Sequence, residues 1–174
     1  MLSHMDGPAV WLVVRVRESE IVDLGGKVKF PRGVVVFSGS RDEAIDYLLK
    51  NGAAGCAVMY AKATAGNGGT ATAGYKGTAT AGDYGTATAG NGGTATAGYK
   101  GTATAGDHGT ATAGNGGTAT AGDHGTVAAG EGGILQIHFR DGGRRRIRTV
   151  YVGENNVKPN TKYRLSYKGD FIPV

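Results

Sequence analysis

This chain of 174 residues contains little cysteine, proline or aromatic side chain. Its single cysteine, Cys56, excludes an intrachain disulfide framework, and its small neighbours Gly55 and Ala57 predict that it is buried. No apolar run approaches the roughly 18 residues of a membrane span, and the N-terminus lacks the residue order of a signal peptide. We therefore expect no membrane span and a cytoplasmic protein by default, with export by another route left open.

The sequence also lacks the residue sets that carry catalysis. No Ser/His/Asp or Cys/His set has a supporting scaffold, and no helix follows the Gly-x-Gly spacings, as a nucleotide-binding fingerprint requires. His108 and His124 follow Asp107 and Asp123 at equivalent repeat positions, where two Asp-His pairs could hold one ion, but solvated imidazoles are the commoner outcome. We expect a non-enzymatic protein with no cofactor and no bound metal.

Glycine, alanine and threonine are abundant instead, and they recur every eight residues. Nine octads begin at Ala65 and run from AGNGGTAT through AGYKGTAT and AGDYGTAT to AGEGGILQ. Thr-Ala-Thr-Ala alternates with period two, which predicts a short strand with threonine on one face and alanine on the other. The Ala-Gly-x-x-Gly part predicts a turn in which glycine takes positive φ. Because one octad alone can bury almost nothing, the copies have to stack as a parallel β-solenoid.

Two coil sizes fit this repeat. The corner residues recur loosely every three octads, which suggests a triangular coil of 24 residues. Three such sides would enclose a space that alanine methyls cannot fill, whereas two sheets face to face need only a thin core. We therefore predict a mainly β protein with a two-sided coil of 16 residues. The expected domains are an α/β N-terminal cap at residues 1–60, the solenoid at 61–136 and a basic β C-terminal cap at 137–174.

The flanking segments predict ordinary strands and one helix. Ser40 and Glu43 form a capping box, which predicts a helix that ends near Gly52. Strands rich in β-branched or other apolar residues are predicted at residues 10–16, 28–39, 55–66, 134–139, 144–153 and 161–172.

In a 16-residue coil the outward threonines form two ladders. One ladder holds Thr70, Thr72, Thr86, Thr88, Thr102, Thr104, Thr118 and Thr120. The other holds Thr78, Thr80, Thr94, Thr96, Thr110 and Thr112, with Thr64 and Thr126 at its ends. Rungs repeat at about 4.8 Å, and the two threonines of a rung lie about 6.7 Å apart. Such a lattice of hydroxyl and methyl groups can order water or match a crystal face; alternatively, threonine serves only the stability of an exposed sheet.

The octad AGYKGTAT resembles the Ala-Gly-Tyr-Gly-Ser-Thr-x-Thr octapeptide of bacterial ice nucleation proteins. The matching positions are Ala97, Gly98, Tyr99, Thr102 and Thr104, whereas Lys100 and Gly101 replace Gly-Ser. The resemblance covers roughly residues 61–136, and the threonine rows are also similar to those of insect antifreeze solenoids. The resemblance to ice nucleation proteins implies that Thr-x-Thr rows organise ice-like water. It also implies that stacked tyrosines, here only Tyr75 and Tyr99, line a dimer seam. Because the family carries many tens of octads, nine octads imply weak ice binding, or nucleation after end-to-end assembly.

Positive charge is concentrated in the C-terminal segment. Residues 133–174 hold nine Lys/Arg against three Asp/Glu, a net +6, whereas residues 65–132 carry a net −2. The densest cluster is Arg144, Arg145, Arg146 and Arg148. Such charges block edge-to-edge stacking of a cap strand. The resemblance implies another use, homo-oligomer assembly through the solenoid ends or edges, against the acidic corners Asp83, Asp107 and Asp123. Nucleic-acid binding through this tail is the third function that we consider. The first is binding of ice or ordered water, and the second is a structural scaffold without ice activity.

Overall fold

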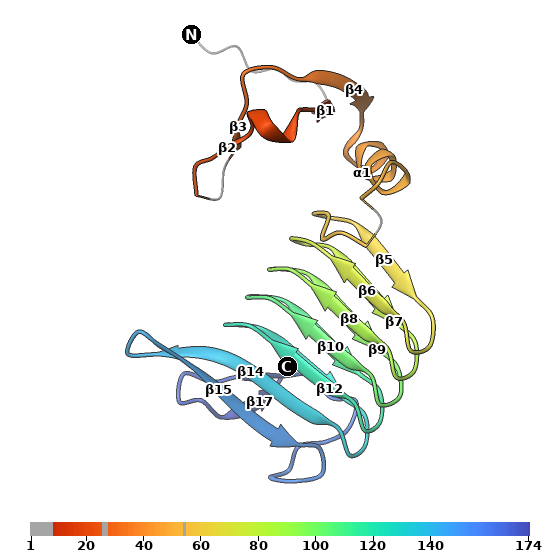
Figure 1. Cartoon of the computed structure of the whole chain (residues 1–174). Coiled ribbons are helices and arrows are strands. Elements are labelled where there is room, and N and C mark those ends of the chain that lie inside the picture. Colours follow the sequence, from red (N-terminus) through yellow and green to blue (C-terminus); the bar gives the residue numbers. More distant parts are fainter. Residues whose placement is uncertain (1–8, 26–27, 54) are drawn as a thin grey trace. The chain divides into compact units, whose positions relative to one another are not determined.

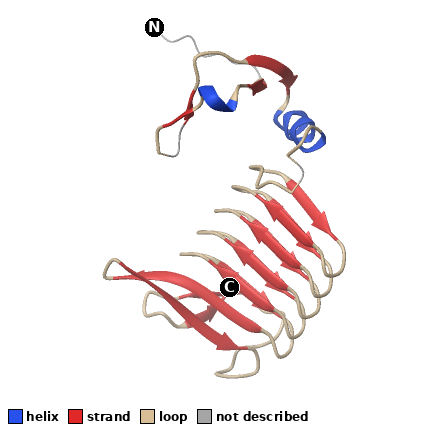
Figure 2. Cartoon of the chain, viewed as in Figure 1, coloured by secondary structure: helices blue, strands red, loops and turns tan. Residues whose placement is uncertain are grey.

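The fold is described from a computed structural model, over residues 9–25, 28–53 and 55–174. The chain divides after residue 54 into two compact units. Strands dominate the described residues, and Figure 2 shows that the helices lie in the first unit. The mainly β fold predicted from the octads is confirmed.

The first unit combines one helix with two small antiparallel sheets. Its elements are β1 (Trp11–Arg15), the 3-10 helix η1 (Glu18–Glu20), β2 (Val22–Asp23), β3 (Val28–Lys29), β4 (Val34–Gly39) and α1 (Arg41–Lys50). β1 pairs with β4, and β2 pairs with β3. The single strand predicted over residues 28–39 is wrong, because the chain leaves the ladder around Pro31, which has no N–H to donate.

The predicted capping box of α1 is confirmed. Glu43 N–H donates to Ser40 Oγ at 3.4 Å, and Ser40 N–H donates to Glu43 Oε2 at 2.9 Å. The Ser40 backbone N–H, and after it the Ser40 hydroxyl, hold the pKa of Glu43 below its ordinary value of 4.5. Gly52, with φ +109°, follows the helix as predicted.

The second unit is a two-sided parallel solenoid in which each strand pairs with the strand sixteen residues further on (Figure 1). Its repeat strands are β5 (Lys62–Ala65), β6 (Thr70–Ala73), β7 (Thr78–Ala81), β8 (Thr86–Ala89), β9 (Thr94–Ala97), β10 (Thr102–Ala105), β11 (Thr110–Ala113), β12 (Thr118–Ala121) and β13 (Thr126–Ala129). Among these repeat strands, the even-numbered ones form one sheet, the even sheet, and the odd-numbered ones form the other, the odd sheet. The 16-residue coil is therefore confirmed, and the three-octad recurrence of corner residues does not describe the coil.

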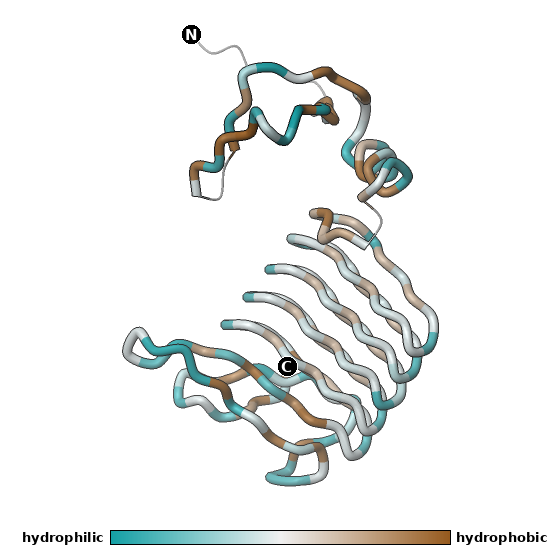
Figure 3. Tube along the Cα trace, in the orientation of Figure 1, coloured by the Kyte–Doolittle hydropathy of each residue, from teal (hydrophilic) through white to brown (hydrophobic). Residues whose placement is uncertain are grey.

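Alanine methyl groups fill the space between the two sheets. Both alanines of each Thr-Ala-Thr-Ala strand from β6 to β12 are buried. The last coil is thicker, because Val127, Leu135 and Ile137 take alanine positions. Figure 3 shows this change as pale solenoid coils followed by brown, more hydrophobic stretches in the C-terminal strands. Small side chains thus permit the thin repeat, and larger ones complete its core at the end.

Each corner turns at the fourth octad position, which need not be glycine. Lys76, Tyr84 and His108 have φ of 51°, 56° and 55° there. The glycines at the second and fifth positions are needed for close approach instead. A Cβ on Gly114 would lie 2.7 Å from the carbonyl carbon of Gly98. The expectation that corner glycines take positive φ is therefore confirmed only at the fourth position, in Gly68, Gly92, Gly116 and Gly132.

Antiparallel strands close the C-terminal end of the solenoid. They are β14 (Ile134–Asp141), β15 (Arg144–Tyr151), β16 (Tyr163–Leu165) and β17 (Phe171–Pro173). β14 stacks in parallel on β12 and then pairs antiparallel with β15, while β16 pairs with β13. The strand predicted over residues 161–172 is thus two short strands joined by a turn.

The start of the solenoid also differs from expectation. Of the strand predicted over residues 55–66, only β5 is extended in a ladder, because the preceding residues form the turns of a corner. Cys56 lies in this turn region and is exposed, so the prediction of a buried cysteine is wrong.

Candidate functional site

The even sheet presents an uninterrupted array of outward threonines, which we call the even face. It consists of Thr70, Thr72, Thr86, Thr88, Thr102, Thr104, Thr118 and Thr120. Strands β6, β8, β10 and β12 pair in register, Thr to Thr and Ala to Ala. Because the alanines point into the core, every threonine of these strands points outward. The structure therefore brings together the eight residues that the sequence grouped on this face.

The odd sheet presents a shorter array, the odd face. It consists of Thr78, Thr80, Thr94, Thr96, Thr110 and Thr112. At one end Lys62 pairs with Thr78, and at the other Thr112 pairs with Ala128, so only Thr64 and Thr126 extend it. The odd face thus has three complete threonine rungs, against four on the even face.

The even face ends at a rung of different chemistry. Ile134 pairs with Thr118, and Gln136 pairs with Thr120. Thr120 Oγ1 lies 3.1 Å from Gln136 Oε1, so the hydroxyl donates to the amide oxygen. This bond occupies a threonine hydroxyl at the last rung, and the free array lies toward β6, β8 and β10.

Side chains at the third octad position link successive corners, a role that sequence reasoning missed. Asn91 Oδ1 accepts the N–H of Asp107 at 3.0 Å, and Asp107 Oδ1 accepts the N–H of Asp123 at 2.9 Å. On the opposite corners Asn67, Asp83 and Asn115 make the same bond to the next coil. The signal was the recurrence of Asn and Asp at this position, since short carbonyl-bearing side chains can accept from a nearby backbone N–H. These bonds fix one coil upon the next.

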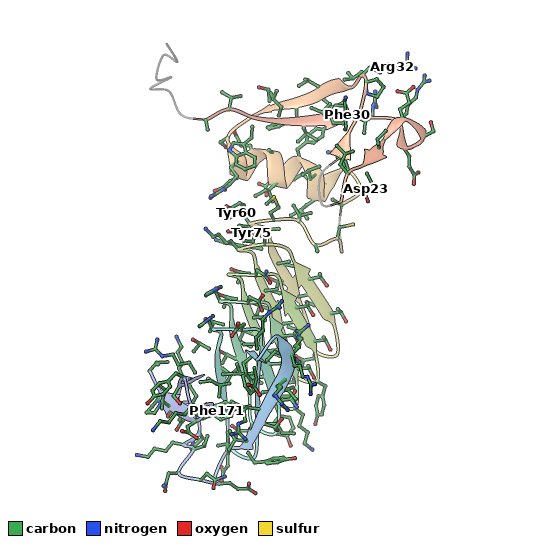
Figure 4. The ribbon with its side chains drawn as sticks, turned by 90° about the vertical axis from the view of Figure 1, so that its left-hand side faces the viewer. Asp23, Phe30, Arg32, Tyr60, Tyr75 and Phe171 are labelled. Carbon is green, nitrogen blue, oxygen red and sulfur yellow. The ribbon has the colours of Figure 1, made fainter. Side chains whose placement is uncertain are left out.

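The two tyrosines of the expected seam lie on opposite columns of corners. Tyr75 follows a strand of the even sheet, and Tyr99 follows a strand of the odd sheet, so no single ladder contains both. Instead the Tyr75 ring packs edge-on against Tyr60, with ring centroids 6.0 Å apart (Figure 4). Tyr99 packs in the same way against Tyr84, at 5.5 Å. The structure therefore does not form the stacked tyrosine ladder that the resemblance implies.

A lysine accompanies each of these tyrosines. Lys100 Nζ lies 5.2 Å from the ring centroid of Tyr99, and Lys76 Nζ lies 5.4 Å from that of Tyr75. Contact with the Tyr99 side chain raises the pKa of Lys100 above 10.5. The Tyr99 contact therefore favours the charged form of Lys100.

The corner histidines stack upon each other. The rings of His108 and His124 lie 5.1 Å apart and nearly parallel, at 10°. Asp107 and Asp123 direct Oδ1 atoms at backbone N–H groups, those of Asp123 and His124. No group of three or more His, Cys, Asp or Glu side chains suited to a metal ion occurs within residues 9–25, 28–53 and 55–174.

An arginine-rich hairpin projects beyond the last coil, and we call residues 138–148 the arginine ribbon. At its base it lines a groove of about 350 Å³ that also contains Asp107 and Asp123. His138 lies in this groove, where burial, and after it the charge of Arg145, lower its pKa below 6.5. The Asp107 carboxylate opposes this shift. The groove therefore sets cationic side chains across from the acidic corners of the same chain.

Comparison with known proteins identifies no relative. No family model matches the chain, and no curated protein or solved structure matches it significantly. Among the described helices, none is both long and apolar enough to cross a lipid bilayer.

Proposed function

We propose that this protein binds ice, or orders water in an ice-like layer, through its threonine faces. The observation that carries this proposal is the even face, in which four Thr-x-Thr rungs stack in register without insertion or charge. Parallel strand spacing repeats the rungs at about 4.8 Å, with about 6.7 Å between the threonines of one rung. A surface that repeats in two dimensions suits a crystalline or water-layer partner better than a flexible ligand.

Rigidity supports this proposal. Threonine is β-branched, so its side chain has few χ1 states to lose when it contacts ordered water. The coils below it are held by backbone ladders and by the Asn and Asp corner bonds. Hydroxyl positions are thus set before binding, which lowers the ordering cost of the interaction.

The small size of the array limits the activity. Four rungs on the even face and three on the odd face span only a few water layers. We therefore propose weak ice binding by the single chain, with nucleation depending on self-assembly that joins several arrays.

The test compares matched substitutions on the two faces. Thr86→Lys with Thr102→Lys disrupts the even face, and Thr94→Lys with Thr110→Lys disrupts the odd face. Lysine is accepted at the equivalent outward position of β5, where Lys62 pairs with Thr78, so both variants are expected to fold. Thermal hysteresis, ice-crystal shaping and droplet freezing are measured for each, with circular dichroism to confirm β structure. We expect the even-face variant to lose most activity and the odd-face variant to lose less.

A structural scaffold is the alternative, favoured by the contacts that tie coil to coil. The Thr120–Gln136 bond and the corner bonds have a stabilising use that needs no ice. An inactive wild-type protein would support the scaffold. Wild-type activity that survives both pairs of lysine substitutions would instead exclude the threonine faces as the ice-binding surface.

A further inference from the structure

The arginine ribbon is a two-stranded structure that extends past the solenoid. β14 pairs with β12 only over residues 134–137, whereas its pairing with β15 continues to Asp141 opposite Arg144. In the described part of the chain, residues 138–141 therefore have no strand partner except β15. Figure 1 shows the hairpin running out beyond the stacked corners. Its side chains are mostly exposed on both faces.

Within the hairpin itself, the positive charge of the arginine ribbon is poorly compensated. It carries Arg140, Arg144, Arg145, Arg146 and Arg148 against one carboxylate, Asp141, which leaves a net +4. Asp141 Oδ2 pairs with Arg146 Nε at 2.7 Å, and Arg148 Nε donates to the Gly169 carbonyl at 3.1 Å. Within the described residues, the other three arginines have no carboxylate at ion-pair distance.

Two of these unpaired arginines face each other across the ribbon. Arg140 is the direct cross-strand partner of Arg145. Like charges directly opposite each other destabilise an antiparallel pair. An anionic ligand that bridges the two guanidinium groups removes this repulsion, so the arrangement favours a bound anion.

We propose that the arginine ribbon binds duplex DNA by entering its major groove. That groove is about 12 Å wide and admits a two-stranded β-ribbon. Four residue pairs beyond the last coil reach about 13 Å, enough for a groove about 8.5 Å deep. Guanidinium groups bind phosphate oxygens in a bidentate manner, so arginine rather than lysine suits this contact.

Both faces of the ribbon carry arginines, so each face can contact the phosphates on one side of the DNA major groove. Alternation along the strands places Arg140 and Arg145 on one face and Arg144, Arg146 and Arg148 on the other. Phosphates of both strands are thereby within reach of a ribbon inserted along its length.

The two depressions beside the base of the ribbon affect this interface in opposite ways. On one side Asp107 and Asp123 line the same groove as Arg140 and Arg145, so their carboxylates weaken phosphate binding at the base of that face and favour contacts near the hairpin tip. On the other side a depression of about 510 Å³ is lined by Arg146, Arg148, Tyr167 and Lys168, among others. Tyr167 is 95% exposed beside Lys168, where an aromatic ring and an ammonium group add contacts to sugar and phosphate.

Two other anionic partners fit less well. The hairpin tip, residues 141–144, is Asp-Gly-Gly-Arg and has no apolar side chain to enter a bilayer. The acidic corners of a second copy offer carboxylates whose Oδ1 atoms already accept backbone N–H groups. Duplex DNA presents one charge per about 1.7 Å along its axis, which matches the dense arginine cluster better.

The test measures binding of the full chain to a 20-base-pair DNA duplex of generic sequence, by fluorescence anisotropy over a series of salt concentrations. The ribbon variant combines Arg140→Gln, Arg144→Gln and Arg145→Gln. The matched control combines Lys158→Gln, Lys162→Gln and Arg164→Gln, which removes the same charge from exposed positions outside the ribbon. A third variant changes the three ribbon arginines to lysine and retains the charge. Circular dichroism and thermal melting establish that each variant folds.

We expect the ribbon variant to bind at least tenfold more weakly and the control to change little. Loss of three phosphate contacts should reduce the slope of log K against log salt concentration by about 2.7. The lysine variant should keep most of that slope while binding less tightly.

Equal losses in the ribbon variant and the control would overturn the proposal in favour of diffuse attraction. It is also overturned if the wild type fails to bind the duplex, including a case in which it binds phosphatidylserine vesicles or only self-associates. Because none of these readouts involves freezing, the result is independent of the proposed ice activity.

Discussion

Glycine at the corners of this solenoid is required mainly for backbone approach, and only in some coils for backbone conformation. From the second octad on, the second-position glycine lies against the backbone of the preceding coil, as Gly114 does against Gly98 and Tyr99. The fourth position needs positive φ, but a Cβ on its glycines would meet no backbone atom within 4 Å, so lysine, tyrosine and histidine are accepted there beside glycine. The two positions therefore differ sharply in the substitutions that they tolerate.

We predict that Gly114→Ala destabilises the solenoid by about 3 kcal/mol, because the added methyl overlaps rigid backbone atoms. The control is Gly116→Asn, at φ +64°, where a Cβ meets only the flexible Lys100 side chain at 3.2 Å. Asparagine tolerates this conformation, so its cost should stay below about 1 kcal/mol. Denaturant unfolding of both variants measures the difference, and equal costs would contradict the distinction between the two positions.

The Asn91 side chain should contribute to stability through its bond to the next coil. Asn91→Ala removes the acceptor of the Asp107 N–H and should cost about 1 kcal/mol. Asn91→Asp keeps the acceptor, as Asp107 itself does one coil later, and should restore most of the loss. Thermal melting checks this pair. If both substitutions cost the same, the corner bond has no energetic role.

β14 is the element at which the repeat becomes a cap. Its first half keeps the register of the repeat strands, whereas its second half runs straight on where earlier coils turn. The change follows from the loss of the corner glycines, since residues 138–140 are His-Phe-Arg where the preceding coil has Gly-Asp-His. One strand thereby closes the core with Leu135 and Ile137 and also supplies half of the arginine ribbon.

His138 should make the stability of this element depend on pH. Burial and Arg145 lower its pKa below 6.5, so the folded state binds fewer protons than the unfolded state just below that pH. Its contribution is therefore complete above about pH 6.5 and is lost as the pH falls below it. We expect acidification from pH 7.5 to 5.0 to lower the melting temperature of the wild type more than that of His138→Gln. Parallel decreases would show that His138 does not titrate in this way.

The helix of the first unit offers a separate test. Ser40→Ala removes the hydroxyl that caps α1 and should cost about 1 kcal/mol in that unit. Ser40→Thr, which keeps a capping hydroxyl, is the control. Amide hydrogen exchange of α1 reports the effect directly, because a lost cap increases exchange in the first helical turn. Unchanged exchange in Ser40→Ala would argue against the cap.

As a whole, the second unit behaves as a one-dimensional stack, in which each coil contacts chiefly its neighbours. Its length is therefore adjustable without a new fold. The C-terminal strands that close this unit differ from the repeats because they contain larger apolar side chains, as β14 and β16 show with Leu135 and Tyr163.

We predict that duplicating residues 89–104 adds one rung to each threonine face and raises both the melting temperature and the freezing activity. The coils formed by β6 to β12 share the same alanine core and glycine corners, so the extra coil should stack in register. A 16-residue Gly/Ser insertion at the same place is the control and should raise neither. Circular dichroism, melting and droplet freezing measure the outcome. A duplicated coil that lowers the melting temperature would contradict a nearest-neighbour solenoid.

The sequence alone determined the solenoid, because period-two alternation and alanine volume leave few ways to bury an octad. The size of alanine selected a coil of 16 residues, and the register of the threonine faces followed from that size. The capping box could also be predicted from the sequence, because Ser40 and Glu43 interact within one helical turn.

Only the tertiary structure decided which residues meet between coils. The 16-residue coil brings Asn91 beside Asp107, but only the structure shows that the Asn91 side chain accepts the Asp107 backbone N–H. Likewise, only the structure shows that the Tyr75 and Tyr99 rings pack edge-on against Tyr60 and Tyr84. The free arginine ribbon also depended on where β14 stopped pairing with β12: the sequence shows that the corner glycines are lost after Ile137, but only the structure shows that residues 138–141 continue as a strand paired with β15 alone among the described strands.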